Sequence, residues 1–353
     1  MAKATDILRN GTLLRNGRNG QYSIFKHLAS GGFGNTYLAH RKGDNYQVAI
    51  KEFFILDVNY RDEGSPFVKT HHGKENLFNS QLKKFRDEAS RVAIMRNQHI
   101  VRLYDYFEEN ATAYYVMEFV DGQSLSERLK TTHQPLAESE ATSYLMQVLD
   151  ALSEVHGKRI WHLDIKPGNI MVTRQGVAKL IDFGASKQID VAGNMTTTAP
   201  PYTPGYAPVE QVEGEMSKFG PWTDFYALGA TFYNLLTNQK APTSSDIIER
   251  GVAAFHFPPN LSARMKNVIY WMMRYNLKDR PQSVAHIMQW WNSNAPQQQR
   301  PVQQSPASQR PVPQRPVPQR PSQGGKVPYA QPKKKKGFGR LSEWYDDLMD
   351  VLD

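Results

Sequence analysis

Two neighbouring segments in the middle of the chain combine the side chains that one kind of chemistry requires. Asp164, Lys166 and Asn169 lie in one short stretch, and Asp182 follows soon after. Phosphoryl transfer needs a carboxylate near the attacking hydroxyl, a cation near the transferred phosphate, and oxygen ligands for magnesium. Each of these residues alone would more often be a turn or surface residue. Their joint occurrence in this order favours phosphoryl transfer.

A glycine-rich stretch and a lysine nearer the N-terminus fit the same chemistry. The stretch from Leu28 to Thr36 lies between two expected strands, where glycines let the backbone approach a phosphate closely. Alone it would more often be a hairpin turn. Lys51 ends an apolar strand and would ordinarily be solvated, so a phosphate-binding role requires a carboxylate partner. We expect Glu88 to be that partner, but spacing leaves three competing carboxylates: Glu52, Glu75 and Asp87.

The elements that must position these residues change in type along the chain. Short β-like runs at 22–28, 36–40, 47–53, 102–107 and 113–118 surround a charged helical stretch at about 74–95. From residue 139 onward, apolar residues recur at helical spacing. A small β-rich part followed by a large helical part predicts two lobes with a cleft between them.

Composition limits the class of protein. The 353 residues carry a formal net charge of +9, which fits several anionic ligands, and we expect no nucleic-acid partner. The absence of cysteine excludes disulfides and thiolate metal sites. No stretch approaches the roughly 18 apolar residues that would span a bilayer, and the N-terminus lacks a secretory apolar run. We therefore expect a soluble, cytoplasmic protein without a transmembrane segment.

The C-terminal part has a different composition from the rest of the chain. Residues 294–332 are rich in Pro, Gln, Arg and Ser, which predicts a disordered linker. Residues 333–353 combine a run of four lysines with a short acidic segment, Leu341 to Asp353, whose apolar residues are spaced for one face of a helix. Because so short a helix is marginal alone, we expect it to dock on a partner. Packing on the chain's own folded domain is the alternative, and the lysines are a weak signal for an anionic membrane surface.

Taken together, these motifs resemble the protein kinase superfamily, in its eukaryotic-type (Hanks-type) bacterial Ser/Thr form, over about Tyr22 to Trp291. The resemblance implies an α+β, bilobal protein kinase fold. Its small β-rich N-lobe (21–118) would carry one main helix, and its large C-lobe (122–293) would be α-helical, after an N-terminal extension (1–20). The implied activity is transfer of the γ-phosphate of ATP to protein Ser or Thr hydroxyls, including autophosphorylation, with Mg²⁺ or Mn²⁺.

The resemblance also implies a role for each motif residue. Asp164 would be the catalytic base, Lys166 would neutralise the γ-phosphate, and Lys51 paired with Glu88 would anchor the nucleotide. Asn169 and Asp182 would hold the metal. The residues expected to contact the nucleotide form the glycine-rich loop, the gatekeeper, the hinge and the two surfaces that sandwich the purine: Leu28, Ala29, Ser30, Gly31, Gly32, Phe33, Gly34, Asn35, Thr36, Ala49, Lys51, Met117, Glu118, Val120 and Met171.

Downstream motifs extend the resemblance. The run from Thr203 to Glu210 resembles the end of an activation segment, and Arg280 is the expected ion-pair partner of Glu210. Asp224 resembles the aspartate that ties the central helix of the large lobe to the catalytic loop. Lys166 and Thr203 are the choices typical of Ser/Thr rather than tyrosine kinases.

Four departures from the family pattern stand out. Ala29 replaces the first glycine of the loop, and Thr36 replaces a valine. Leu163 stands where the family has an arginine that binds a phosphate on the activation loop. We therefore expect activity that does not strictly depend on phosphorylation of that loop, where Thr196, Thr197 and Thr198 are the candidate sites. The stretch 57–81 is longer than a minimal connection, and we expect a simple surface insertion, its His71-His72 pair not being a metal site.

Two other functions compete with an active protein kinase. A pseudokinase-like signalling scaffold would keep the fold without the chemistry, but the four residues that the chemistry needs, Lys51, Asp164, Asn169 and Asp182, are present. A small-molecule kinase of related fold would not need the peptide-docking surface that the segment from Thr203 to Glu210 resembles.

Overall fold

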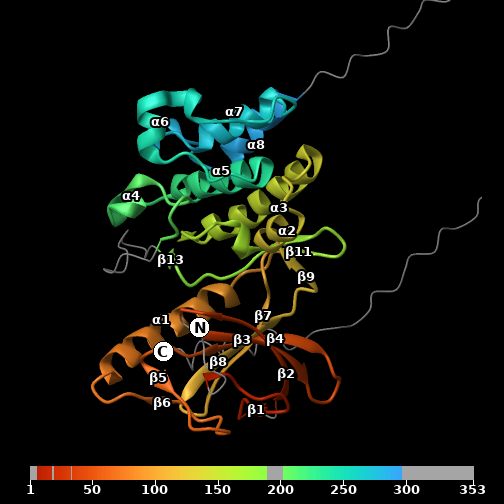
Figure 1. Ribbon diagram of the computed structural model, residues 1–353, viewed down its shortest axis with the longest axis vertical. Helices are drawn as coiled ribbons and strands as arrows, with labels where there is room; N and C mark the ends of the chain where they lie inside the picture. The colour runs from red at the N-terminus through yellow and green to blue at the C-terminus, as the bar shows by residue number, and fades with distance from the viewer. Residues whose placement is uncertain (1–5, 18–19, 33, 189–201, 296–353) are drawn as a thin grey trace, which may run out of the picture.

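The computed structural model describes residues 6–17, 20–32, 34–188 and 202–295. These form a small β-rich N-lobe and a larger helical C-lobe (Figure 1). The predicted α+β, two-lobed architecture is therefore confirmed. The linker expected at 294–332, beyond its first two residues, and the segment expected at 333–353 lie outside the described residues, as do Phe33 and Thr196 to Thr198.

The N-lobe is built on a six-stranded antiparallel sheet. Its strand order is β1-β2-β3-β4-β8-β7, with bounds β1 Leu13–Arg15, β2 Gln21–Gly31, β3 Gly34–Arg41, β4 Gln47–Phe53, β7 Leu103–Glu109 and β8 Thr112–Glu118. The five strands expected from the sequence are all present. Helix α1, Glu75–Ala93, covers one face of this sheet, close to the predicted 74–95.

Both faces of this sheet are buried, each by a different covering. Alternate residues of a strand point to opposite faces, so Phe53 packs toward α1 while Ile50 packs on the outer face. Leu8 and Leu14, from the segment before β2, belong to the outer core. The described residues 6–17, expected to belong to an N-terminal extension, thus pack as part of the N-lobe.

The stretch 57–81 is packed rather than a simple surface insertion, so that expectation is wrong. It forms a small hairpin of β5, Asn59–Tyr60, and β6, Lys69–Thr70. Val58 and Val68 are buried, and the Arg61 side chain is only 1% exposed. A hairpin brings residues on both of its arms against the lobe, which the length of the stretch alone could not indicate.

The C-lobe is organised around α5, Pro221–Thr237, whose side chains are mostly buried. Helices α3, Glu138–Gly157, and α7, Ala263–Met272, pack against it. The remaining helices are α2 Leu125–Thr132, α4 Val209–Val212, α6 Ser244–Arg250 and α8 Val284–Ser293. In the part of the chain that the structure describes, no helix has the length and apolarity needed to cross a membrane.

Short strands of the C-lobe flank the two segments that are expected to be catalytic. Strand β9, Gly122–Ser124, pairs with β11, Ile170–Thr173, which pairs with β12, Ala178–Leu180. A Cβ atom on Gly122 would lie 1.9 Å from the Val172 carbonyl oxygen, so only glycine permits this approach. Strand β10, Ile160–Trp161, pairs with β13, Lys187–Gln188. These pairings place 162–169 and 182–184 side by side.

Candidate active site

Lys51 of β4 is held by two carboxylates from different parts of the chain. Its Nζ lies 2.8 Å from Glu88 Oε1 on α1 and 3.1 Å from Asp182 Oδ1. The Tyr115 hydroxyl donates to the same Glu88 oxygen at 2.6 Å. Burial would lower the pKa of Lys51, but the charges of Asp182 and Glu88 outweigh it and raise that pKa well above its ordinary value. The lysine is therefore a fixed cation.

Of the carboxylates that could have paired with Lys51, the structure brings Glu88 to it. Glu52 follows Lys51 directly and so points to the opposite face of the sheet, where it is fully buried. Glu75 lies in the first turn of α1, near the exposed His72, and 57% of its side chain is exposed.

Asp164 receives hydrogen bonds from three side chains. Lys166 Nζ donates to its Oδ2 at 2.7 Å, Asn169 Nδ2 to the same oxygen at 2.8 Å, and Thr203 Oγ1 to Oδ1 at 2.6 Å. Lys166 also donates to Thr203 Oγ1 at 3.0 Å. Three donors on two carboxylate oxygens fix the orientation of the Asp164 side chain. The contact from Thr203 was not predicted, because it joins segments distant in sequence.

The loop that carries Asp164 is anchored on α5. The Asp224 carboxylate accepts from the backbone amides of His162, at 2.9 Å, and Leu163, at 2.8 Å. Leu163 has φ of 62°, a left-handed conformation that a branched residue rarely adopts. The His156 ring lies 2.8 Å from the same carboxylate. The expected tie between Asp224 and this loop is thus present, and it holds a strained backbone.

Asn169 and Asp182 form a donor set that suits a magnesium ion. Both side-chain hydrogen bonds of Asn169 leave from Nδ2, toward Asp164, which leaves Oδ1 as an acceptor. The charge of Lys51 lowers the pKa of Asp182 to about 2, so its carboxylate is ionised at neutral pH. Magnesium commonly takes one or two protein oxygens together with substrate phosphates and water. The residues present fit such an ion.

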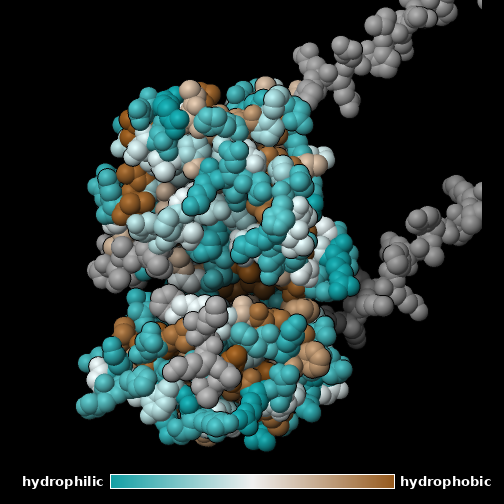
Figure 2. All heavy atoms as spheres, viewed as in Figure 1, coloured by the Kyte–Doolittle hydropathy of each residue, from teal (hydrophilic) through white to brown (hydrophobic). Residues whose placement is uncertain are grey.

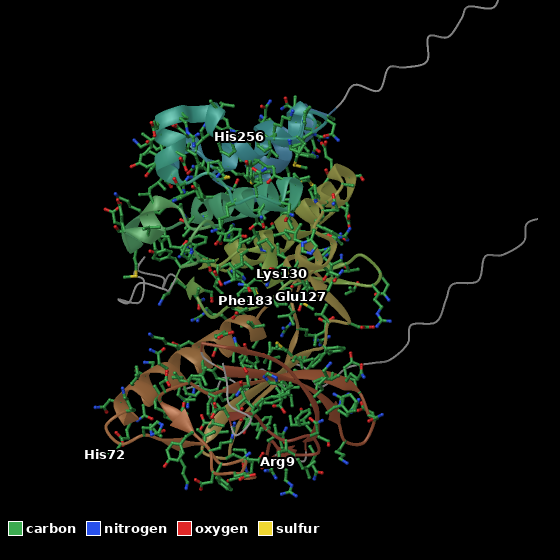
Figure 3. The ribbon with its side chains drawn as sticks, in the orientation of Figure 1. Arg9, His72, Glu127, Lys130, Phe183 and His256 are labelled. Atoms are coloured by element: carbon green, nitrogen blue, oxygen red, sulfur yellow. The ribbon has the colours of Figure 1, made fainter. Side chains whose placement is uncertain are left out.

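Histidines 71 and 72 do not contribute to a metal site in the described residues. His72 lies at the outer tip of the N-lobe, away from Phe183 at the junction of the lobes (Figure 3). No group of three or more His, Cys, Asp or Glu side chains placed to hold a metal occurs within the described part of the chain. His71 instead stacks on Tyr60, with ring centroids 4.6 Å apart.

The glycine-rich stretch contains the turn between β2 and β3. Gly31 pairs with Gly34 across the turn. A Cβ on Gly34 would lie 2.0 Å from the Glu52 carbonyl oxygen, so this position admits only glycine. The Asn35 side chain points to the outer face of the sheet and is 2% exposed, so only its backbone can face a ligand. The predicted nucleotide contact of Asn35 therefore stays a prediction, and it would have to come from the backbone.

The expected adenine-binding residues lie where the two lobes meet. Ala49 of β4 pairs with Met117 of β8, and Met171 lies on β11 in the other lobe. The surface between the lobes is recessed, and hydrophobic atoms show inside it (Figure 2). The Glu118 amide donates to the Arg102 carbonyl at 2.8 Å, so Glu118 can offer a ligand only its carbonyl group. Leu28 to Gly31 lie on β2, Gly32 follows that strand, and Val120 lies in the connection between β8 and β9.

The end of the expected activation segment is fixed by a fully buried ion pair. Arg280 donates to Glu210 from both terminal nitrogens, at 2.7 and 3.2 Å, and the two side chains are at most 1% exposed. The Thr223 hydroxyl also donates to Glu210, at 3.1 Å. This predicted pair is present, and it joins the segment to the C-lobe.

Leu163 lies in a small apolar cluster instead of facing the solvent. The cluster consists of Trp161, Leu163, Ala185 and Phe219, all buried. Close to it, Arg91 of α1 donates to Ser186 Oγ at 2.7 Å. Two contacts therefore hold the start of the activation segment, one apolar and one through α1. The contact from Arg91 was not predicted.

Known proteins share this arrangement. The family described as the protein kinase domain matches residues 22–291. The serine/threonine-protein kinases PknA of Nostoc and PrkC of Bacillus subtilis are each 31% identical to this chain, over 74% and 63% of it. Aurora kinase C of mouse is 28% identical over 76% of this chain and 89% of its own length.

The match to the two bacterial relatives is partial on their side. The aligned part spans 45% of PknA and 31% of PrkC. A solved structure, the apo form of PpkA-294, has a TM-score of 0.69 at 23% identity and covers 81% of this chain and 99% of its own, which supports the fold. With the family match extending over most of the chain, from β2 to α8, this chain belongs to the protein kinase family.

Proposed function

We propose that this chain transfers the γ-phosphate of ATP to Ser or Thr hydroxyls of proteins. The observation that carries the proposal is the convergence of Lys166, Asn169 and Thr203 on the Asp164 carboxylate. That arrangement puts a hydrogen-bond acceptor, a cation and a hydroxyl at one point, beside the Lys51, Glu88 and Asp182 cluster. The names of the bacterial relatives, which are serine/threonine-protein kinases, favour the same substrate class.

The contacts support a role for each residue that the family resemblance implies. The substrate hydroxyl oxygen forms a bond to the γ-phosphorus while the bond from that phosphorus to the bridging oxygen of ADP breaks. The hydroxyl proton passes to Asp164, and Lys166 offsets charge on the transferred group. Lys51, held by Glu88, binds the inner phosphates. Mg²⁺ or Mn²⁺ held by Asn169 and Asp182 would neutralise charge on the phosphate oxygens.

We also propose that activity does not strictly depend on phosphorylation of the activation segment, although autophosphorylation is expected. Leu163 cannot bind a phosphate, and its side chain is occupied in packing against Trp161 and Phe219. The apolar cluster and the Arg91–Ser186 hydrogen bond support an ordered start of the segment without a modification. The candidate sites Thr196 to Thr198 lie outside the described residues.

The competing functions predict different outcomes. A pseudokinase-like scaffold has no reason to keep the cleft carboxylates paired to Lys51 and Lys166. A small-molecule kinase would not need Thr203 placed beside the Asp164 carboxylate. The docking role of Leu341 to Asp353 and the cytoplasmic location remain predictions, the former because the segment lies outside the described residues.

The test is transfer from labelled ATP with magnesium to a generic basic protein, with phosphoamino-acid analysis of the product. We expect label on Ser and Thr. Asp62→Asn is the matched control for Asp164→Asn, because Asp62 is an exposed N-lobe aspartate paired with Lys69. The control should label like wild type. A folded, ATP-binding wild type that labels nothing would favour the scaffold, and label on small molecules alone would favour the other alternative.

A further inference from the structure

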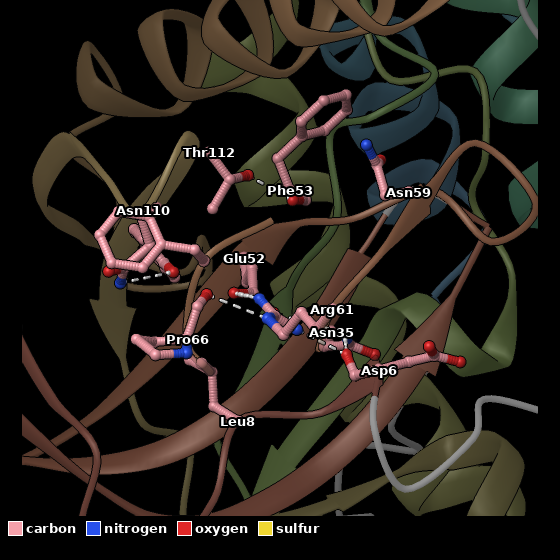
Figure 4. Close-up of polar contacts among 12 residues, drawn as sticks. Asp6, Leu8, Asn35, Glu52, Phe53, Asn59, Arg61, Pro66, Asn110 and Thr112 are labelled. Carbon is pink, nitrogen blue, oxygen red and sulfur yellow. Dashed lines mark hydrogen bonds and ion pairs between the residues drawn. The ribbon is translucent and has the colours of Figure 1, made fainter. Parts of the chain in front are cut away.

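A buried polar cluster lies on the outer face of the N-lobe sheet, behind the glycine-rich loop. We name it the outer cluster and define it as Asp6, Asn35, Tyr37, Glu52 and Arg61. Figure 4 labels four of these residues, Asp6, Asn35, Glu52 and Arg61. Glu52 and Arg61 form an ion pair, with side chains 0% and 1% exposed. Arg61 also donates to the Asp6 carbonyl at 2.7 Å and the Pro66 carbonyl at 3.0 Å. The cluster therefore joins the segment before β1, the neighbouring strands β3 and β4, and the β5–β6 hairpin.

The cluster reaches the loop through Asn35. The Tyr37 hydroxyl donates to Glu52 Oε2 at 2.8 Å, and Asn35 Nδ2 to the same oxygen at 3.4 Å and to the Asp6 carbonyl at 3.0 Å. Asn35 Oδ1 accepts from Ser30 Oγ at 2.7 Å. A continuous chain of polar contacts thus runs from Arg61 to Ser30.

The last link of this chain closes the base of the loop. Ser30 and Asn35 are partners across β2 and β3, directly behind the Gly31–Gly34 pair. The hydrogen bond between their side chains therefore limits how far the two arms can separate. The next pair along is glycine on both sides, which supplies no side chains to hold the arms together.

Stability alone does not account for this cluster. A buried ion pair contributes little net stability, because desolvation offsets most of the attraction, and an apolar pair of similar size would serve as well. Burial raises the pKa of Glu52, and the charge of Arg61 opposes that rise. What an apolar pair could not do is accept the hydrogen bond from Asn35. Resting on the proposed function, we propose that Arg61 and Glu52 are positioning residues that hold the glycine-rich loop over the phosphates through Asn35 and Ser30.

The experiment uses the full chain and two variants that avoid an unpaired buried charge. Asn35→Ala cuts the link beyond the ion pair, and Glu52→Leu with Arg61→Met removes both charges together. We expect each to weaken the affinity for ADP with Mg²⁺ about tenfold, the size of one hydrogen bond to a charged group. Because both cut one chain of contacts, combining them should add little further. Lys69→Gln with Asp62→Asn, an exposed pair in the same hairpin, should bind like wild type.

Two measurements separate positioning from a purely structural role. If the ion pair serves only stability, the affinity of each variant for ADP with Mg²⁺ will fall only as its melting temperature falls. A variant with the melting temperature of wild type would then bind ADP as tightly as wild type does. That result would overturn the proposal. Amide hydrogen exchange at residues 29–32 without nucleotide should be about tenfold faster in Asn35→Ala and unchanged in α5. This readout needs no ligand, so unchanged exchange in Asn35→Ala overturns the positioning proposal whether or not wild type binds ADP. A wild type that binds no ADP would count against the proposed function instead.

Discussion

The cleft and the outer face of the N-lobe sheet both carry charged side chains, arranged in opposite ways. In the cleft, the Asp182 side chain is 45% exposed and that of Lys166 is 28% exposed. In the Glu52–Arg61 pair of the outer cluster, and in the Glu210–Arg280 pair, the side chains are at most 1% exposed. The cleft groups keep surface that a ligand can reach, whereas the buried pairs are enclosed by protein. The difference separates residues suited to chemistry from residues suited to holding structure.

This contrast predicts the largest loss of stability at a buried pair. Arg280→Met would leave Glu210 charged and buried without its partner. The free energy of unfolding should fall by about 3–5 kcal/mol, because an unpaired buried charge is that costly. Chemical denaturation measures it. Arg250→Met, which breaks an exposed pair with Asp246, should cost less than about 1 kcal/mol. Equal losses in the two variants would remove the distinction between buried and exposed pairs.

In the cleft, a substitution should lower activity strongly and stability only slightly. Lys51→Met removes the cation between Glu88 and Asp182, and kcat/KM should fall about 100-fold because a phosphate contact is lost. The free energy of unfolding should change by less than about 2 kcal/mol. Steady-state kinetics and denaturation on the same preparation give both numbers. A variant that unfolds easily yet turns over normally when folded would contradict the assignment.

The Lys51→Met variant also tests the electrostatics of the cleft. The charge of Lys51 is the main cause that lowers the pKa of Asp182 from 3.8 to about 2. A carboxyl with a lowered pKa stabilises the fold above its unfolded pKa, and that contribution is lost as pH falls from about 4 through about 2. The stability difference between wild type and Asp182→Asn should therefore shrink over this range. In the Lys51→Met background the difference should show little pH dependence.

The smallest effect is expected at the activation segment. Replacing Thr196, Thr197 and Thr198 together by alanine should lower kcat by less than about threefold, since Leu163 offers no positive charge to bind a phosphate on the activation segment. Mass spectrometry reports whether these residues carry phosphate in wild type. Abolished turnover in the triple variant would sink the proposal of phosphorylation-independent activity.

Features that depend on residues close in sequence were predicted, whereas several contacts between residues distant in sequence were not. The five strands and α1 were predictable because alternating and helical apolar patterns are local, and Glu88 lies at a helical position that faces β4. The pairing of Arg61 with Glu52 was not, because it depends on the path of the β5–β6 hairpin. The packing of Leu8 and Leu14 was missed because two leucines are too few to show the apolar spacing of a helix or a strand.

The contacts around the candidate base illustrate the same limit. Asp164, Lys166 and Asn169 lie close in sequence, so their spacing alone indicated one site. Thr203 reaches Asp164 only through the fold of the activation segment, and the hydroxyl contact could not be read from its position. Sequence thus predicted which groups would meet and left the final partner of the carboxylate to the structure.

The most direct test of the central claim compares turnover and nucleotide binding in Asp164→Asn. This change keeps the shape of the side chain but removes the group proposed to accept the hydroxyl proton. The account predicts a fall in kcat of about 1000-fold, within the range of general base catalysis, with an affinity for ADP and Mg²⁺ close to that of wild type. Turnover within a few fold of wild type would contradict the assignment of Asp164 as the base.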